Sequence, residues 1–200
     1  MTMTTLSDRQ TPGAKDAPAH LTNRQLGLLV AMASWGMLFG TFILSFLLYR
    51  ARMPVWPPLG TEAVPPLLPT IATGLLFASS FFIHVAYRQL LSRESKDFKR
   101  FWGIGTFLGF LFLVLQAGTW NHMVKMGMTL QSNFFASIYY TLTGLHAVHV
   151  VGGLAWLGWV WFRADRFIEN GSTSIPQLSG WFWHFMDALW LLMFVLLVLV

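Results

Sequence analysis

The chain has 200 residues, of which 55% are hydrophobic and 10% are charged, and its mean hydropathy is +0.56. This composition is typical of an integral membrane protein and excludes an ordinary soluble domain. The chain has no cysteine, which excludes disulfides, thiolate metal sites and covalent attachment of a c-type haem. Its net charge of +5 is compatible with nucleic-acid binding, so the positions of the basic residues along the chain have to be considered.

The N-terminal segment, residues 1–23, is polar and contains Pro12, Gly13 and Pro18. It lacks the apolar core of a signal peptide. We therefore expect a disordered cytoplasmic tail, followed by one membrane domain that covers residues 24–200.

Five apolar stretches follow the tail, and each is long enough to cross a bilayer, which takes about 20 mostly apolar residues. None contains Lys or Arg, and none shows the two-residue alternation of a membrane β-strand, so all five are predicted to be helices. Short loops between them predict an all-α, up-and-down bundle in which sequential helices are antiparallel neighbours. In chain order the stretches are 26–49, 66–87, 101–124, 135–162 and 181–200.

Glycines recur at helix-packing spacing in the third and fourth stretches. Small residues allow the backbones of two membrane helices to approach closely. Bundle packing alone explains these glycines, so they indicate no function. They are Gly103, Gly105, Gly109, Gly144, Gly152, Gly153 and Gly158.

The basic residues lie mainly on one side of the predicted bundle. The N-terminal segment and the second and fourth loops carry ten Lys and Arg residues, against three on the other side. Such an excess marks the cytoplasmic side, so the N-terminus is predicted to be cytoplasmic and the C-terminus outside. The net charge therefore reflects topology and anionic lipid headgroups, not nucleic acid.

Asp187 is the only carboxylate inside the five stretches. A charge at membrane depth is costly unless it is paired or hydrogen-bonded. His184 lies three positions earlier on the same helical face and is the expected local partner. Because no other stretch contains Asp or Glu, a structural anchor is a better interpretation of Asp187 than a transmembrane proton relay.

Four histidines lie in three of the stretches. His146 and His149 share a face of the fourth stretch, and we expect them to hydrogen-bond neighbouring helices or a partner subunit. A bis-histidine haem b site is the alternative, because His84 and His184 lie at a similar depth near the cytoplasmic ends of their helices.

Arg163 and Arg166 directly follow the fourth stretch. Basic side chains at a membrane surface are candidate ligands for a lipid phosphate. Tryptophans crowd the same ends of the last two stretches and are interpreted as an interfacial belt. They are Trp156, Trp159, Trp161, Trp181, Trp183 and Trp190.

Two longer motifs and a shorter one carry a resemblance to a known family. Residues 143–153 read TGLHAVHVVGG, residues 183–190 read WHFMDALW, and Leu115-Gln116-Ala117 precedes both. Together they resemble subunit III of the haem–copper terminal oxidases, the cytochrome c oxidase subunit 3 family. That family has the elements Thr-Gly-x-His-x-x-His-Val-x-x-Gly and Trp-His-Phe-x-Asp-x-x-Trp in the same order and at the same separation.

The resemblance implies a five-helix member of the family. Such proteins bind no metal or haem; they flank the catalytic subunit, hold phospholipids between helix groups, and support proton uptake and lasting turnover. By the resemblance, Arg163 matches a position that contacts a lipid headgroup. The other matched positions are structural or interfacial in the family and not catalytic: His146, His149, Trp183, His184, Asp187 and Trp190.

The chain departs from the family pattern at two carboxylates. The family commonly has Glu in a Ser-Glu element of its first core helix and a second Glu shortly after Leu-Gln-Ala. Ser34-Trp35 and Thr119 stand at those places here. A role of those carboxylates near a proton entry or a lipid site is therefore not carried over to this chain.

The predicted function is that of a non-catalytic subunit III of a respiratory haem–copper oxidase, which is a cytochrome c or quinol oxidase that reduces dioxygen and translocates protons. Haem and copper would belong to the partner catalytic subunit I. Subunits II and IV, bound phospholipid and a respiratory supercomplex are the further partners expected. The expected location is the bacterial inner membrane.

Three alternatives stay open at this point. A haem b or quinone-binding membrane cytochrome would use His84 and His184. An accessory subunit of a nitric oxide reductase would share the membrane fold. A transporter should show broken helices, whereas only Pro69 interrupts a stretch, near its start.

Overall fold

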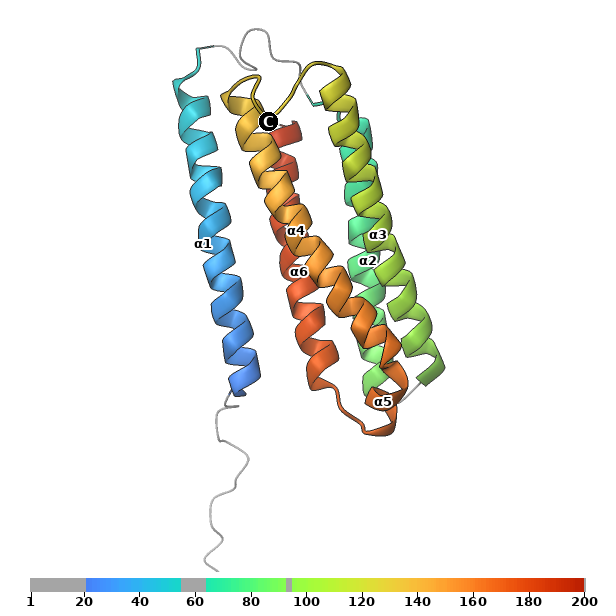
Figure 1. Cartoon of the computed structure of the whole chain (residues 1–200). Helices are drawn as coiled ribbons and strands as arrows, with labels where there is room; N and C mark the ends of the chain where they lie inside the picture. Colours follow the sequence, from blue (N-terminus) through green and yellow to red (C-terminus); the bar gives the residue numbers. More distant parts are fainter. Residues whose placement is uncertain (1–20, 55–63, 93–94, 200) are drawn as a thin grey trace, which may run out of the picture.

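The structure, a computed structural model, describes residues 21–54, 64–92 and 95–199, and these residues form helices joined by short connections (Figure 1). Five helices are long and apolar enough to cross a membrane, as predicted. They are α1 (Asn23–Arg52), α2 (Leu67–Leu91), α3 (Ser95–Lys125), α4 (Phe134–Phe162) and α6 (Ser174–Phe194). The disordered tail was predicted over residues 1–23; residues 1–20 lie outside the described residues, whereas Thr22 caps α1 and Asn23 begins it.

Polar residues set the helix ends. The Thr22 hydroxyl accepts a hydrogen bond from the Gln25 backbone N–H, and the Gln25 side chain accepts one from the Thr22 N–H, which makes a capping box at the start of α1. Asn133 caps α4 by accepting from the Ala136 N–H at 2.7 Å. Beyond the end of α3, Gly127 has a φ of 83°, a left-handed conformation that favours glycine.

The predicted loop at 163–179 is wrong over most of its length. A short helix, α5 (Ala164–Glu169), follows α4 directly, and α6 begins at Ser174. Pro176 lies in the first turn of α6. Proline is tolerated there because the first N–H groups of a helix have no intrahelical acceptor. A short π-helical turn, η1 (Val195–Leu199), continues α6 to the end of the described chain.

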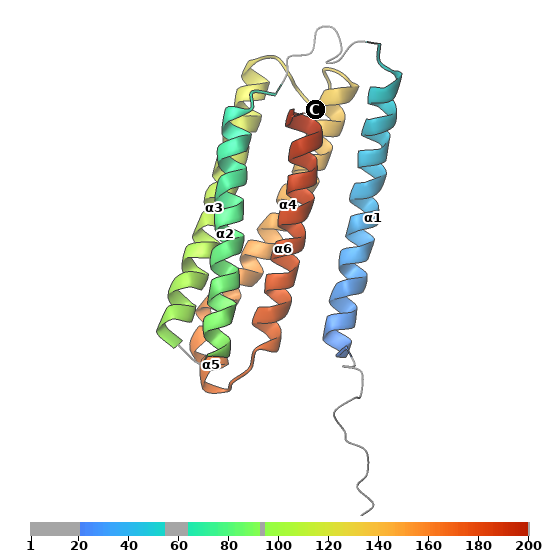
Figure 2. The same cartoon turned by 180° about the vertical axis from the view of Figure 1, so that it is seen from behind.

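The arrangement of the helices differs from the predicted order of neighbours at one place. α2 packs along α3, and α6 occupies the centre, in contact with α1, α2 and α4 (Figures 1 and 2). α1 contacts α4 and α6 instead of α2, its predicted neighbour, and only 11% of its apolar window is buried.

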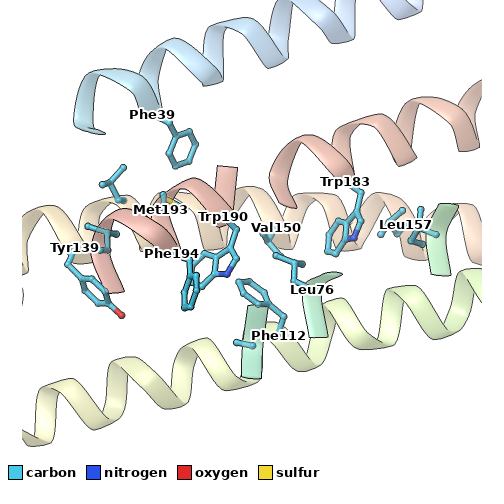
Figure 3. Packing of buried hydrophobic residues seen from close by; sticks show 14 of the residues in the cluster. Phe39, Leu76, Phe112, Tyr139, Val150, Leu157, Trp183, Trp190, Met193 and Phe194 are labelled. Atoms are coloured by element: carbon cyan, nitrogen blue, oxygen red, sulfur yellow. The ribbon is translucent and has the colours of Figure 1, made fainter. Parts of the chain in front are cut away.

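The centre of the bundle is packed with apolar side chains from all five spanning helices: α1, α3, α4 and α6 supply aromatic rings, and α2 supplies aliphatic side chains such as Leu76 (Figure 3). Glycines make the closest approaches possible. A Cβ added at Gly105 would lie 2.8 Å from Ile83, and one at Gly109 would lie 2.6 Å from the Trp183 ring. The predicted packing role therefore holds for these glycines, whereas an added Cβ at Gly144, Gly152 or Gly158 would meet nothing within 4 Å.

Gly109→Ala is expected to lower the stability of the subunit by about 1–3 kcal/mol, the usual cost of overpacking a dense core. The new methyl group would displace the Trp183 indole, which cannot move without disturbing α4. Gly118→Ala on the same helix is the control, because its Cβ would meet nothing within 4 Å and alanine favours helix formation. Thermal unfolding in detergent measures both; an equal midpoint for the two variants would contradict the packing role of Gly109.

Candidate functional site

The motif tryptophans of α6 are interhelical anchors. The Trp183 indole N–H donates to the Ser79 hydroxyl at 3.1 Å, and the Trp190 N–H donates to the Thr73 hydroxyl at 2.9 Å. Ser79 in turn donates to the Gly105 carbonyl at 2.7 Å. Both tryptophans are buried, Trp183 to 1% exposure. An interfacial belt is therefore the wrong interpretation for these two, because their rings lie inside the bundle (Figure 3).

Asp187 does not pair with His184 as expected. The carboxyl group is buried at 7% exposure, and its Oδ1 atom forms no hydrogen bond. The Ser80 hydroxyl on α2 lies close to it, but outside hydrogen-bonding geometry. α6 packs on α2, and Asp187 lies on the side of α6 that faces α2. The Asp side chain is short, so its carboxyl group reaches α2 and no helix further away.

His184 faces a second imidazole instead. Its ring centroid lies 6.2 Å from that of His84, which is exposed on the surface of α2. Since α6 begins at Ser174, His184 lies about 15 Å along the helix at 1.5 Å per residue.

The His84–His184 pair does not fit the bis-histidine haem alternative. A haem macrocycle lies between its two axial imidazoles and extends far beyond both rings. Directly behind the pair, α2 and α6 are in contact: the Trp183 N–H reaches Ser79, and a Cβ added at Gly180 would lie 3.9 Å from Ile83. No slot for a macrocycle separates the helices. Among the described residues, no three His, Asp or Glu side chains gather as metal ligands.

His146 is fully enclosed at 1% exposure, and neither ring nitrogen has a hydrogen-bond partner within the described part of the chain. Its ring packs against three aromatic rings from three other helices: Phe39 of α1, Phe112 of α3 and Trp190 of α6. The expected interhelical hydrogen bond is wrong for His146. Edge-to-face contacts of the His146 ring with Phe39 and Phe112, and a tilted contact with Trp190, join four helices here.

His149 also makes no hydrogen bond to another helix among the described residues. Its Nδ1 atom donates to the Leu145 carbonyl of its own helix at 2.8 Å. The Trp35 ring of α1 lies 5.1 Å from it, edge-on, and also contacts Phe182 of α6. Trp35, which stands where the family commonly has Glu, therefore packs α1 onto α4 and α6 through aromatic contacts.

An open cavity of about 510 Å³ lies where α1, α4 and α6 meet, at the end of the bundle where α1 begins. The Arg163 guanidinium lies 5.1 Å above the Trp159 ring, which lines this cavity. Arg24 also lines the cavity. From the sequence alone, this residue was only one of the basic residues that predict the orientation of the bundle. The other lining residues are Asn23, Gly27, Leu28, Trp156, Ile175 and Leu178.

The cationic groups near this cavity lack acidic partners. Asp165 accepts a hydrogen bond from Lys99 at 2.9 Å, which ties α5 to α3. Arg24, Arg163 and Arg166 form no ion pair within the described residues. Arg24 and Arg163 therefore remain available to an anionic group, whereas Arg166 is exposed on α5 and does not line the cavity.

Sequence reasoning missed the hydroxyl groups of α2. Thr73 and Ser79 accept the two indole N–H bonds, and Ser80 lies beside Asp187. The available signal was the recurrence of Ser and Thr in an otherwise apolar stretch, because such side chains commonly bond across membrane helices.

Comparisons with known proteins connect these features to a family. The family model described as cytochrome c oxidase subunit III matches residues 16–199. The cytochrome c oxidase subunit 3 of Synechocystis sp. is 32% identical over 197 residues, which cover 97% of this chain and 83% of the relative. That of Thermostichus vulcanus is 34% identical over 184 residues, covering 90% and 89%.

A third relative is less similar to this chain. The cytochrome c oxidase subunit 3 of Bos taurus is 27% identical over 187 residues, which cover 89% of this chain and 70% of the relative. The family model spans nearly the whole chain, and two relatives exceed 30% identity over most of their length. The chain therefore belongs to the cytochrome c oxidase subunit III family.

Proposed function

We propose that the chain is a non-catalytic, stabilising subunit of a respiratory haem–copper oxidase in a bacterial inner membrane. Other subunits of such a complex carry haem and copper, and this chain packs beside the catalytic one. The main observation behind the proposal is that the motif residues Trp183, Trp190 and His146 all make contacts between helices. These side chains build a rigid bundle and are not presented to a substrate.

The proposed topology places the start of α1 on the cytoplasmic side. Among the described residues, six basic side chains lie near the end of the bundle where α1 begins: Arg24, Arg88, Lys99, Arg100, Arg163 and Arg166. The opposite end carries Arg50, Arg52 and Lys125. An excess of positive charge favours the cytoplasmic side.

The same subunit is proposed to bind a phospholipid in the cavity between α1 and α4. Arg24 and Arg163 supply the cationic groups for its phosphate, and Arg163 is held over Trp159 by a cation–π contact. The apolar walls, including Leu28 and Trp156, suit an acyl chain. One lipid would therefore fill the gap that separates α1 from α4 at this end.

A pull-down through an N-terminal tag in mild detergent tests the function. The expected eluate contains a partner subunit that carries haem and copper, with no haem on this chain by denaturing separation. A haem absorption spectrum that follows this chain alone would contradict the proposal. Optical spectroscopy and mass spectrometry of the eluate measure both outcomes.

Arg163→Ala is expected to remove about one phospholipid per complex, because the phosphate loses its stacked guanidinium group. Arg52→Ala is the control, since Arg52 lies at the opposite end of α1. Native mass spectrometry counts the retained lipids. Unchanged lipid content in the Arg163 variant, with the control also unchanged, would show that the lipid binds elsewhere.

A further inference from the structure

α1 is held to the rest of the bundle along the C-terminal part of its length. Its buried residues are Phe39, Ile43 and Phe46, and no residue from 23 to 38 is buried. All five aromatic residues of α1 lie between positions 35 and 49. Because packing contacts are a main force that joins membrane helices, the first turns of α1 are the least firmly attached part of the helix.

Ring contacts fix the C-terminal part of α1. The Tyr49 ring lies 4.5 Å from the Phe134 ring at the start of α4. At the other limit of this part, the Trp35 ring lies 5.1 Å from the His149 ring of α4. The residues of α1 that precede Trp35 contain no aromatic side chain. These residues, 23–34, are called the arm below.

The arm stands beside the cavity of about 510 Å³, and the opposite wall of that cavity is rigid. Gly27 and Leu28 line the cavity from the arm, and Trp156 and Trp159 line it from α4. The Trp159 ring is supported from behind by Phe167 of α5, at 5.9 Å between ring centroids. A movement that changes the width of the cavity therefore belongs to the arm and not to the tryptophan wall.

Gly27 has no packing role in the position that the structure shows. A Cβ added there would meet nothing within 4 Å, and glycine weakens a helix relative to alanine. Small residues let another helix approach the backbone closely, and Gly27 lines the cavity. A second position of the arm, with Gly27 against the tryptophan wall, would give this glycine a packing role.

A hinge is present where the arm meets the anchored part of α1. The Ser34 hydroxyl donates to the Val30 carbonyl at 2.9 Å, a local bond that often bends helices. Gly36 follows two residues later, and Gly/Ser pairs are places where helices kink. The arm is about 18 Å long at 1.5 Å per residue, so a bend of about 20° at the hinge moves its tip by about 6 Å.

We propose that residues 23–34 are a movable arm with two positions. The structure shows the open position, and in the closed position Gly27 packs against the rings of Trp156 and Trp159. A phospholipid in the cavity holds the arm open, and this part of the proposal rests on the proposed function. Loss of the lipid lets the arm close, because contact with the tryptophan wall then buries the apolar surface that the acyl chain had covered.

Distances between pairs of spin labels test the proposal in the full chain in detergent, with and without added phosphatidylglycerol. Because the chain has no cysteine, each pair of labels needs only two substitutions. Leu26→Cys with Phe162→Cys reports on the arm, and Leu48→Cys with Thr141→Cys is the control pair in the anchored part; all four positions are exposed. Without lipid, the arm pair is expected to show a second distance that is shorter by about 6 Å, the estimated movement of the tip. Added phosphatidylglycerol is expected to remove it, and the control pair should keep one distance throughout.

A steric variant blocks the closed position without touching the open one. Gly27→Leu is expected to abolish the shorter distance, because a leucine side chain keeps the arm away from the tryptophan wall. Gly40→Leu is the matched control on the same helix, since a Cβ there also meets nothing within 4 Å and Gly40 does not line the cavity. A shorter distance that persists in Gly27→Leu would overturn the proposal.

Native mass spectrometry of the same samples separates the arm from the lipid site. A single unchanged distance for the arm pair, whether or not phosphatidylglycerol binds, would overturn the arm. A shorter distance that depends on Gly27, in a chain that binds no phosphatidylglycerol, would support the arm and show that the proposed lipid site fails.

Discussion

Trp183→Ala is expected to lower the free energy of unfolding of the subunit by about 3–5 kcal/mol, the usual cost of deleting a buried aromatic side chain. The ring is 1% exposed and fills the space left by Gly109 and Gly153. The variant also removes the N–H bond to Ser79, which joins α6 to α2. Chemical denaturation in detergent micelles, followed by circular dichroism, measures the loss.

Two controls separate the contributions of Trp183. Trp183→Phe keeps much of the aromatic contact and loses the hydrogen bond, so its expected cost is about 1–3 kcal/mol. Trp159→Ala removes an indole that is 40% exposed and is expected to cost much less. If the Trp183 and Trp159 alanine variants were equally stable, an anchoring role for Trp183 would be untenable.

Asp187→Ala is expected to lower the yield of assembled oxidase about tenfold, which corresponds to about 1.4 kcal/mol of association free energy. The variant removes a buried polar group of the α6 motif, whose Oδ1 atom has no hydrogen-bond partner among the described residues. The isolated subunit should lose little stability, because Asp187 Oδ1 has no hydrogen-bond partner to lose. Yield of haem-bearing complex and thermal unfolding of the free subunit measure the two effects.

The same variant distinguishes an anchor from a proton relay. An anchor lowers the amount of complex more than the turnover of each assembled complex. A relay carboxylate would leave the yield equal and abolish turnover, and that result would reject the anchor. Ser80→Ala serves as a companion variant, since it changes the neighbour of the carboxyl group and keeps the carboxyl group itself.

Local patterns were sufficient to predict the five spanning helices and the family motifs. Each stretch contains enough apolar residues to cross a bilayer, and a helix satisfies its backbone within its own segment. The boundaries were less accurate. α3 and α6 begin before the predicted positions, at Ser95 and Ser174, because helices continue into the polar interface beyond the apolar window. α5 was missed, because its six residues are amphiphilic and too few to show a period.

Side-chain partners were decided by the tertiary structure. The sequence pointed from Asp187 to His184, since residues three apart share a helical face. Packing of α6 on α2 brings Ser80 to the carboxyl group instead and His84 to His184. The partner of α1 was also decided at this level, because α6 lies between α1 and α2.

The class of protein, the helices and the family can be predicted without a structure, because they depend on composition, on hydropathy within one window and on short motifs. The bundle decided what the motif residues do. Trp190 donates to Thr73 across 117 positions of sequence, and His146 packs between rings from three other helices. Such contacts depend on how helices pack around one another, and no local pattern encodes which distant side chain will fill the space beside a given ring.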